Sequence, residues 1–306
     1  MISIIYVYYN SYTVIQESIK SLLKNDFKNY EIIIVVNKCE DNKVEKLSLL
    51  SDKIKVIYNE NENKGFGFAN NLGAKNARGE YLLILNPDTI LENNVLSEMY
   101  GLMEKEKNIG ASICKLIDEN NNIQKTVMRL KYNLLSILIN HFFLHKIPII
   151  NRLYKKHYYY EPYYTKIQFP QTISGAFMFI RKKIYDNIGG FDEKYFMYSE
   201  DNDLSIRINK ISKIIYYPKV TTIHIGATTF GKAKSIENLK IFYKSLFYFI
   251  EKFYGKKKLF LMKIAFKINA IVLFPFVYAI SNQNLKITLI NRNKLFLKMP
   301  LRGTDV

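Results

Sequence analysis

The chain has 306 residues, of which 48% are hydrophobic and 24% charged, and its formal net charge is +18. This composition excludes a disordered or fibrous protein, and the length can bury a full core in one large domain with an appended region. The chain has only two cysteines, and they do not form the regularly spaced set of a disulfide-stabilised scaffold. The protein therefore does not need an oxidising compartment to fold.

The first half of the chain alternates short apolar runs with helical patterns. The runs predict strands at residues 2–9, 31–36, 53–58 and 81–85, separated by helices that start at Thr13 and span 43–50 and 66–77. Thr13 with Gln16 three residues later predicts a capping box. This order predicts an α/β fold with a mostly parallel sheet. The N-terminus lacks a basic segment before its short apolar run, so we expect a first strand rather than a signal peptide, and a cytoplasmic protein.

The second half is less regular. Residues 132–164 predict an amphipathic excursion, residues 172–181 a strand that contains Gly175, residues 200–209 a helix, and residues 214–217 a closing strand before Pro218. From about Ser235 the chain is helical, basic and aromatic. We therefore expect two regions, an α/β domain at residues 1–230 and a basic amphipathic helical region at residues 231–306.

Positive charge is concentrated in the C-terminal quarter. Residues 232–306 contain fifteen Lys and Arg against three acids, or +12, which favours anionic partners such as diphosphates, nucleic acid or an acidic membrane face. A lysine-rich coding bias is the alternative explanation. Residues 268–280 carry no charge but are short for a membrane span of roughly 20 residues, and Lys263 and Lys267 precede them. We expect an interfacial helix with snorkelling lysines on an anionic membrane surface; a span or a soluble packing element are the alternatives.

The first candidate site lies where the fourth predicted strand ends. Asp88 follows that strand directly, and ligands of open parallel sheets bind at the carboxyl ends of strands. A carboxylate there suits a hard cation that shares its oxygen ligands with phosphates. The alternative is a simple turn, because Asn86-Pro87-Asp88-Thr89 consists of turn-favouring residues.

A second acidic group opens the helix predicted at residues 200–209. Glu200, Asp201 and Asp203 are crowded enough to repel one another, and this repulsion raises a carboxyl pKa toward that of a useful base. The alternative is stabilisation of the helix N-terminus. Asp203 and Arg207 have i, i+4 spacing and predict a structural ion pair, which leaves Asp201 or Glu200 for catalysis.

Other patterns narrow the class of protein. His224, after a strand, is structural unless folding places it beside Asp88. The stretch from Gly65 to Gly73 is not the dinucleotide-binding fingerprint, and no Walker A motif occurs, which disfavours a dehydrogenase and a P-loop enzyme. No nucleic-acid module is recognisable, so we expect no nucleic-acid partner.

In their order along the chain, these pieces resemble family 2 glycosyltransferases, especially the bacterial rhamnosyltransferase-like members, over about residues 1–230. The resemblance implies the GT-A fold, a Rossmann-like α/β sheet flanked by helices with an Asp-x-Asp-type motif that holds Mg²⁺ or Mn²⁺. Asn86 occupies the first position of that motif. The motifs that carry the resemblance are Val7–Ser11, Glu31–Val36, Asn63–Gly65, Asn71–Gly73, Asn86–Asp88, Ser174–Ala176, Gly189–Glu193, Glu200–Leu204 and His224.

The resemblance also implies site residues. It makes Asp88 and His224 metal ligands, Asp201 the general base with Glu200 beside it, and Gly175 part of the sugar pocket. Asn37 stands where the family usually has a nucleobase-binding Asp, and its amide can keep that role. The residues expected on the nucleotide-sugar side are Tyr8, Tyr9, Asn10, Asn37, Asn63, Gly65, Asn71, Asn86 and Gly175.

The implied activity is inverting transfer of a hexosyl group, with rhamnose one candidate, from a nucleoside-diphosphate sugar. The acceptor would be a cell-surface glycan or a polyprenyl-diphosphate-linked glycan at the inner membrane face. One alternative is a nucleotidyltransferase, although Tyr9-Asn10-Ser11 lacks the usual Gly-rich basic loop. The other is a non-catalytic binding protein, against which the intact Glu200-Asp201 pair argues.

Overall fold

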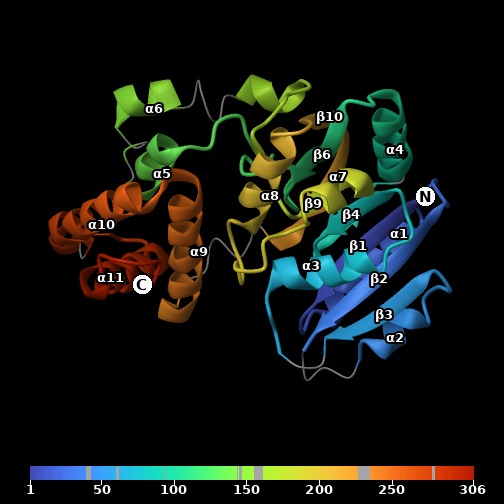
Figure 1. Ribbon diagram of the computed structural model, residues 1–306, viewed down its shortest axis with the longest axis horizontal. Helices are drawn as coiled ribbons and strands as arrows, with labels where there is room; N and C mark the ends of the chain where they lie inside the picture. The colour runs from blue at the N-terminus through green and yellow to red at the C-terminus, as the bar shows by residue number, and fades with distance from the viewer. Residues whose placement is uncertain are drawn as a thin grey trace. The chain divides into compact units, whose positions relative to one another are not determined.

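A computed structural model describes residues 1–38, 43–59, 62–92, 94–142, 144, 147–154, 161–226, 235–277 and 280–306. The chain forms two compact units (Figure 1). The first consists of Met1–Tyr132, Arg152–Lys194 and Asp201–Ala227, and the second of Asn133–Asn151, Tyr195–Glu200 and Thr228–Val306. The predicted boundary at residues 230 and 231 lies outside the described residues and stays a prediction.

The first unit is built on a mixed, mostly parallel sheet. In the described part of the chain it has eight strands in the order β3-β2-β1-β4-β9-β6-β10-β5. All pairs are parallel except β4 with β9, β9 with β6, and β10 with β5. The strands are β1 Ile2–Tyr8, β2 Tyr30–Asn37, β3 Ile54–Asn59, β4 Tyr81–Leu85, β5 Thr89–Leu91, β6 Ile109–Ile117, β9 Phe177–Arg181 and β10 Lys213–His224. A separate two-stranded sheet pairs β7 Met128–Arg129 with β8 Thr172–Ile173.

Helices pack onto this sheet, as expected where strands read as continuous apolar runs. They are α1 Tyr12–Leu23, α2 Glu45–Ser48, α3 Phe66–Lys75, α4 Val95–Lys105, α7 Lys182–Asn187 and α8 Glu200–Asn209. The stretch between β7 and β8 contains α6 Pro148–Tyr154, whose residues 148–151 belong to the second unit, and the 3₁₀ helix Glu161–Thr165. Helix α3 approaches β1 and β2 closely at Gly73, where an added Cβ would lie 2.6 Å from Ile5 Cγ2. A side chain at this position would push the helix away from the sheet.

Several predicted elements are confirmed and others are corrected. The strand at 81–85 and the helix at 200–209 have the predicted bounds. The capping box at Thr13 is wrong, because α1 follows Ser11 and Gln16 instead donates to the Tyr12 hydroxyl (3.2 Å). The strand predicted at 172–181 is two strands in two sheets, because Ser174–Ala176 turns the chain between them.

The last predicted strand extends much further than its sequence pattern indicated. Strand β10 continues through Pro218 to His224, and its register against β6 shifts between Tyr217 and Thr221. Proline has no N–H for a ladder, and such an irregularity is where a strand tolerates it. His224 is therefore the final residue of a strand rather than part of a following loop.

The second unit is helical, in agreement with the predicted C-terminal region. Helix α5 Leu134–His141 belongs to it together with α9 Ile236–Tyr254, α10 Lys256–Val277 and α11 Gln283–Lys298. Its core contains an aromatic cluster in which the Tyr243 and Phe266 rings lie 4.6 and 4.9 Å from the Phe296 ring. Among the residues that the structure describes, no helix has the length and apolar character needed to cross a membrane.

Lys263 of α10 does not have the exposed, snorkelling side chain that the sequence predicts. Lys263 is fully buried, and its Nζ donates to the carbonyls of Pro300 (2.9 Å) and Asp305 (2.7 Å) while standing 4.9 Å from the Phe247 ring centroid. Lys267 Nζ donates to the Leu297 carbonyl at 3.2 Å. Lys263 therefore binds two backbone carbonyls in the core of its unit, whereas Lys267 is partly exposed and its snorkelling stays a prediction.

Candidate active site

The end of β4 and the end of β10 bring two predicted ligands together. After β4, Asn86-Pro87-Asp88 turns the chain into β5, which pairs antiparallel with β10 so that Thr89 lies opposite His224. Asp88 Oδ1 stands 3.3 Å from His224 Nε2, and Asn86 Nδ2 lies 3.3 Å from the same nitrogen. Folding thus places His224 beside Asp88, as the metal-ligand assignment required, and two distant parts of the chain form one polar site.

Gln124 fixes the orientation of the His224 ring. Its Nε2 donates to the backbone carbonyl of His224 (2.6 Å), which leaves its Oε1 facing Nδ1 of the ring at 2.8 Å. Because an amide oxygen can only accept, Nδ1 carries the proton, and in the neutral ring the Nε2 lone pair points toward Asn86 and Asp88. A ring nitrogen presented in this way is suited to bind a cation.

The backbone after β10 closes tightly over Asp88. Ile225 N–H donates to the Asp88 carbonyl (2.9 Å), and a Cβ built on Gly226 would lie 2.1 Å from Asp88 Oδ2. Only a residue without a side chain leaves the Asp88 carboxylate in this position. The close approach explains why the Thr-Ile-His-Ile-Gly stretch ends in glycine.

Asp201 is attached to the same edge of the sheet through β9. Because β4 pairs with β9, the Asn86 N–H reaches the Ala176 carbonyl (3.0 Å), and the neighbouring Gly175 N–H donates to Asp201 Oδ2 (3.3 Å). Asp88 and Asp201 are thus joined through the short turn Ser174–Ala176.

The two oxygens of the Asp201 carboxyl differ in the hydrogen bonds that they accept. Oδ1 accepts from the N–H (2.7 Å) and the side-chain amide (3.0 Å) of Asn202, whereas the hydrogen bond from Gly175 to Oδ2 is longer. Burial raises the pKa of Asp201, and the nearby Arg129 charge opposes that shift. Arg129 Nη1 also donates to Asn202 Oδ1 (3.1 Å), so Arg129 and Asn202 together position the carboxyl.

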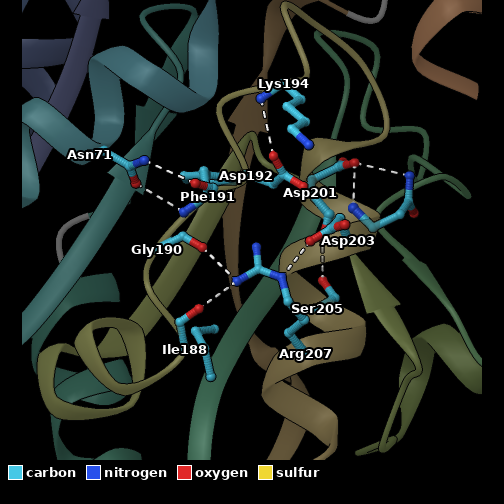
Figure 2. Close-up of polar contacts among 11 residues, drawn as sticks. Asn71, Ile188, Gly190, Phe191, Asp192, Lys194, Asp201, Asp203, Ser205 and Arg207 are labelled. Atoms are coloured by element: carbon cyan, nitrogen blue, oxygen red, sulfur yellow. Dashed lines mark hydrogen bonds and ion pairs between the residues drawn. The ribbon is translucent and has the colours of Figure 1, made fainter. Parts of the chain in front are cut away.

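Asp203 has a structural role, as its spacing predicted. It is fully buried and forms an ion pair with Arg207, whose Nη1 donates to the carbonyls of Ile188 (2.9 Å) and Gly190 (2.7 Å) (Figure 2). The opposite side of the Gly189–Glu193 turn is held by Asn71, which exchanges two hydrogen bonds of 2.9 Å with the Phe191 backbone (Figure 2). The turn before the acidic helix is therefore fixed from α3 and from α8.

The glycosyl transferase family 2 model matches residues 3–189 of the chain. The protein belongs to glycosyltransferase family 2. Its relatives include Rhamnosyltransferase WbbL of Escherichia coli (strain K12), to which it is 30% identical over 229 residues, or 68% of this chain and 79% of that protein. It is 34% identical over 79 residues to N-acetylglucosaminyl-diphospho-decaprenol L-rhamnosyltransferase of Mycobacterium tuberculosis, which covers 26% of this chain and 25% of the relative.

Solved structures show that this glycosyltransferase has a GT-A-like α/β fold. Residues 1–349 of S. aureus TarS match 95% of the chain with a TM-score of 0.55 and 16% identity, over 89% of that structure. GalNAc-T7 with UDP, GalNAc and Mn²⁺ matches 74% of the chain with a TM-score of 0.56 and 17% identity. The chain spans only 43% of the GalNAc-T7 structure.

The expected nucleotide side of the glycosyltransferase contains an asparagine network at the ends of β2 and β3. Asn37 Nδ2 donates to Asn63 Oδ1 (2.6 Å) and to the Gly65 carbonyl (3.2 Å), and Asn37 Oδ1 accepts from Asn59 (2.9 Å). The network ties both strands to the start of α3. A base contact through Asn37, Asn63 or Gly65 stays a prediction, and it would use the second lone pair of Asn37 Oδ1.

The aromatic residues at the end of β1 differ in exposure. Tyr8 is fully buried, so its ring would have to move to reach a nucleotide, and Tyr8 is left out of the proposed contacts. Tyr9 is 54% exposed and Asn10 has a φ of 48°, in the left-handed region. Asn71 uses its amide on the 185–193 segment, including a bond from the Tyr185 hydroxyl at 2.6 Å. Tyr9 and Asn10 remain the predicted nucleotide contacts.

Glu200 is buried at the end of the Tyr195–Glu200 segment of the second unit. The two residues before it, Tyr198 and Ser199, have φ values of 73° and 66°, which are strained for residues with side chains. The segment is held by Ser245 Oγ, which donates to the Met197 carbonyl (2.7 Å), and by the Tyr198 ring, 5.5 Å from that of Phe242. The segment that ends at Glu200 is therefore held by α9 within the second unit.

The sequence patterns do not indicate Gln124, Arg129 or Asn202 as site residues. Gln124 lies in a loop and Arg129 in a two-residue strand, and neither belongs to a recognisable motif. Asn202 stands between Asp201 and Asp203, whose carboxylates dominate the local pattern. Within the described residues, no three His, Cys, Asp or Glu side chains form a group that could hold a metal ion. Any cation at Asp88 and His224 would therefore need further oxygen ligands from a substrate or water.

Proposed function

We propose that this glycosyltransferase transfers a sugar from a nucleoside-diphosphate donor with inversion, using Asp201 as the general base. The supporting observation is that Asp201 and the pair of Asp88 and His224 lie at the two ends of one hydrogen-bonded connection through Gly175 and Ala176. The raised pKa of Asp201, caused by burial, favours proton uptake from an acceptor hydroxyl.

Asp88 and His224 would hold Mg²⁺ or Mn²⁺ together with oxygens of the donor diphosphate. The two side chains fit such an ion, because a carboxylate oxygen and a ring nitrogen with its lone pair fixed by Gln124 point to one place. When bound, the ion would act as a Lewis acid on the leaving diphosphate. The structure of GalNAc-T7 with UDP, GalNAc and Mn²⁺ supports this proposal by analogy of fold.

In the proposed reaction the acceptor hydroxyl approaches the anomeric carbon from the side of Asp201. Oδ2 takes the hydroxyl proton as the new glycosidic bond forms, while Asn202 keeps Oδ1 occupied and the carboxyl in one orientation. The bond between the anomeric carbon and the diphosphate oxygen breaks in the same displacement, which inverts the anomeric centre. Gly175 as part of the sugar pocket stays a prediction: a Cβ built at this position would lie in ordinary van der Waals contact with Phe66 and Asp201, at 3.4 and 3.6 Å.

The names of two relatives support a hexosyl donor, with rhamnose as the first candidate, and a polyprenyl-diphosphate-linked glycan as acceptor. A lipid-linked acceptor would place the enzyme at an anionic membrane surface on the cytoplasmic side. The +12 charge of residues 232–306 supports that location.

A thermal-shift screen tests the proposed donor class. Nucleoside diphosphates and nucleotide sugars are added to the full chain with Mn²⁺, and one donor should raise the melting temperature selectively. The selected donor is then used in a transfer assay with a synthetic prenyl-diphosphate acceptor. Equal response to all nucleotides, or none, would argue against the proposal.

We expect Gln124→Ala to weaken Mn²⁺ affinity by about 10- to 100-fold, the usual effect of losing a hydrogen-bond partner of a metal ligand. Loss of the amide leaves the His224 ring free to rotate and to change tautomer. Calorimetric titration of Mn²⁺ in the presence of the nucleoside diphosphate measures the effect. The variant His141→Gln changes a histidine of the second unit and serves as the control. It should leave the Mn²⁺ titration unchanged.

In the pH profile of kcat/KM, the fall in activity on the acid side, the acid limb, should occur at a higher pH than the pKa of an ordinary aspartate, because burial raises the pKa of Asp201. Removing the opposing charge with Arg129→Met raises this pKa further, so the limb should move to higher pH. Arg129→Lys keeps the charge and should stay closer to the wild type. If the acid limb does not move in the Arg129→Met variant, the charge of Arg129 does not affect the pKa of the group that titrates.

A further inference from the structure

Helix α10 has an apolar face that is exposed to solvent. Leu261, Ile268, Ile271 and Val272, the α10 stripe, are between 56% and 63% exposed. Ile268 follows Leu261 by 7 residues, and Ile271 and Val272 follow Ile268 by 3 and 4 residues, which places all four on one side of the helix. The opposite side carries Leu259, Met262, Phe266 and Ala270, all buried. The helix is therefore apolar on two sides, and only one of them is needed for the core.

A cavity of about 740 Å³ lies at the N-terminal end of the stripe. Its walls combine apolar side chains with three cations and one acid, Glu251, whose carboxylate lies 4.0 Å from Lys256 Nζ. The other lining residues are chiefly Lys256, Lys257, Phe260, Leu261, Leu301 and Arg302. Leu261 belongs to both the stripe and the cavity. Apolar surface thus continues from the helix face into a pocket rimmed by positive charge, an arrangement suited to a ligand with an anionic head and an apolar chain.

We propose that the α10 stripe and this cavity form the site where the protein binds anionic phospholipids of a bilayer. The proposed function places the enzyme at an anionic membrane surface, and the present proposal rests on that placement and names the residues that would bind the membrane. The stripe spans about 17 Å along the helix, so α10 would lie in the plane of the interface. Lys257 and Arg302 would contact lipid phosphates at its N-terminal end.

Charge separates this partner from a second copy of the chain. Residues 252–304 contain eleven Lys and Arg and no Asp or Glu, and all of these cations except the buried Lys263 and Arg292 are at least partly exposed. Two such surfaces brought together would repel one another, whereas an anionic bilayer attracts the exposed charges. The stripe is aliphatic rather than aromatic, so it offers no stacking platform for nucleic-acid bases.

The chain contains no tryptophan, which permits a direct test by fluorescence. The full-length Ile268→Trp variant carries its single indole in the stripe, and Leu49→Trp places one at a residue that is 85% exposed in the first unit. With vesicles of phosphatidylcholine containing about one third phosphatidylglycerol, emission from the Ile268→Trp variant should move to shorter wavelength and be quenched by brominated lipid. Emission from the Leu49→Trp variant should not change, and pure phosphatidylcholine should have little effect on either.

Sedimentation with the same vesicles tests the residues. Ile268→Asp with Ile271→Asp should lower the bound fraction at least about tenfold, because two apolar contacts with the bilayer are replaced by charges. Lys257→Glu with Arg302→Glu should lower it more than the equal charge change Lys240→Glu with Lys244→Glu on α9. Inorganic phosphate should not compete, which distinguishes lipid from a free anion.

Several outcomes would overturn the proposal. They are equal binding to neutral and anionic vesicles, equal losses in the two charge-reversal variants, and a dimer in light scattering that the Ile268→Asp, Ile271→Asp variant abolishes. The nucleotide thermal shift is measured on every variant. A retained shift with lost vesicle binding isolates the lipid site, whereas vesicle binding without any nucleotide shift means that only the proposed function has failed.

Discussion

Asp201→Asn should lose about 10²- to 10⁴-fold in turnover, the usual contribution of a general base, while donor binding survives. The amide keeps the size of the carboxylate and can still accept from the Gly175 and Asn202 N–H groups, so the fold of the site should persist. The measurement pairs single-turnover transfer with calorimetric titration of the donor. Retained turnover in this variant would reject Asp201 as the base.

Two neighbouring carboxylates provide matched controls for this experiment. Glu200→Gln should keep most of the turnover if Asp201 alone accepts the proton, and a loss equal to that of Asp201→Asn would reassign the base. Asp203→Asn removes the buried partner of Arg207, so it should lower the melting temperature more than kcat. The three variants therefore separate catalysis from stability within one turn of α8.

The sequence was most informative where local pattern and tertiary environment agree. Strand β4 is a continuous apolar run buried on both sides, and α8 starts with three acids, and both have the predicted bounds. Only the family resemblance predicts that Asp88 and His224 lie together. Their meeting depends on the antiparallel pairing of β5 with β10, which no local pattern encodes.

The sequence was least informative where tertiary contacts override pattern. The apolar stretch at 172–181 reads as one strand, yet hydrogen bonds to Val127 and Asn86 turn the backbone at Ser174–Ala176. Lys263 follows the pattern of an exposed lysine on an interfacial helix, but it is buried because the carbonyls of Pro300 and Asp305 satisfy its ammonium group. In both cases the deciding partner is far away in the chain.

Asp88→Ala should abolish the metal-dependent part of donor binding. The carboxylate is one of the two side chains that would hold the ion, and an alanine leaves the His224 ring as the sole remaining ligand of that pair. Calorimetry with the nucleoside diphosphate, with and without Mn²⁺, measures the difference. The wild type should bind more tightly with Mn²⁺, whereas the variant should bind equally in both conditions.

Gly226→Ala tests the same assignment without changing a ligand. The added Cβ would lie 2.1 Å from Asp88 Oδ2, and because that oxygen ends a flexible side chain, the carboxylate should swing away while the fold persists. We therefore expect this variant to lose most of the Mn²⁺ effect with little change in melting temperature. A variant of Asp88 or Gly226 that kept the full Mn²⁺ effect would place the ion elsewhere, since a cation held between Asp88 and His224 cannot tolerate displacement of the carboxylate.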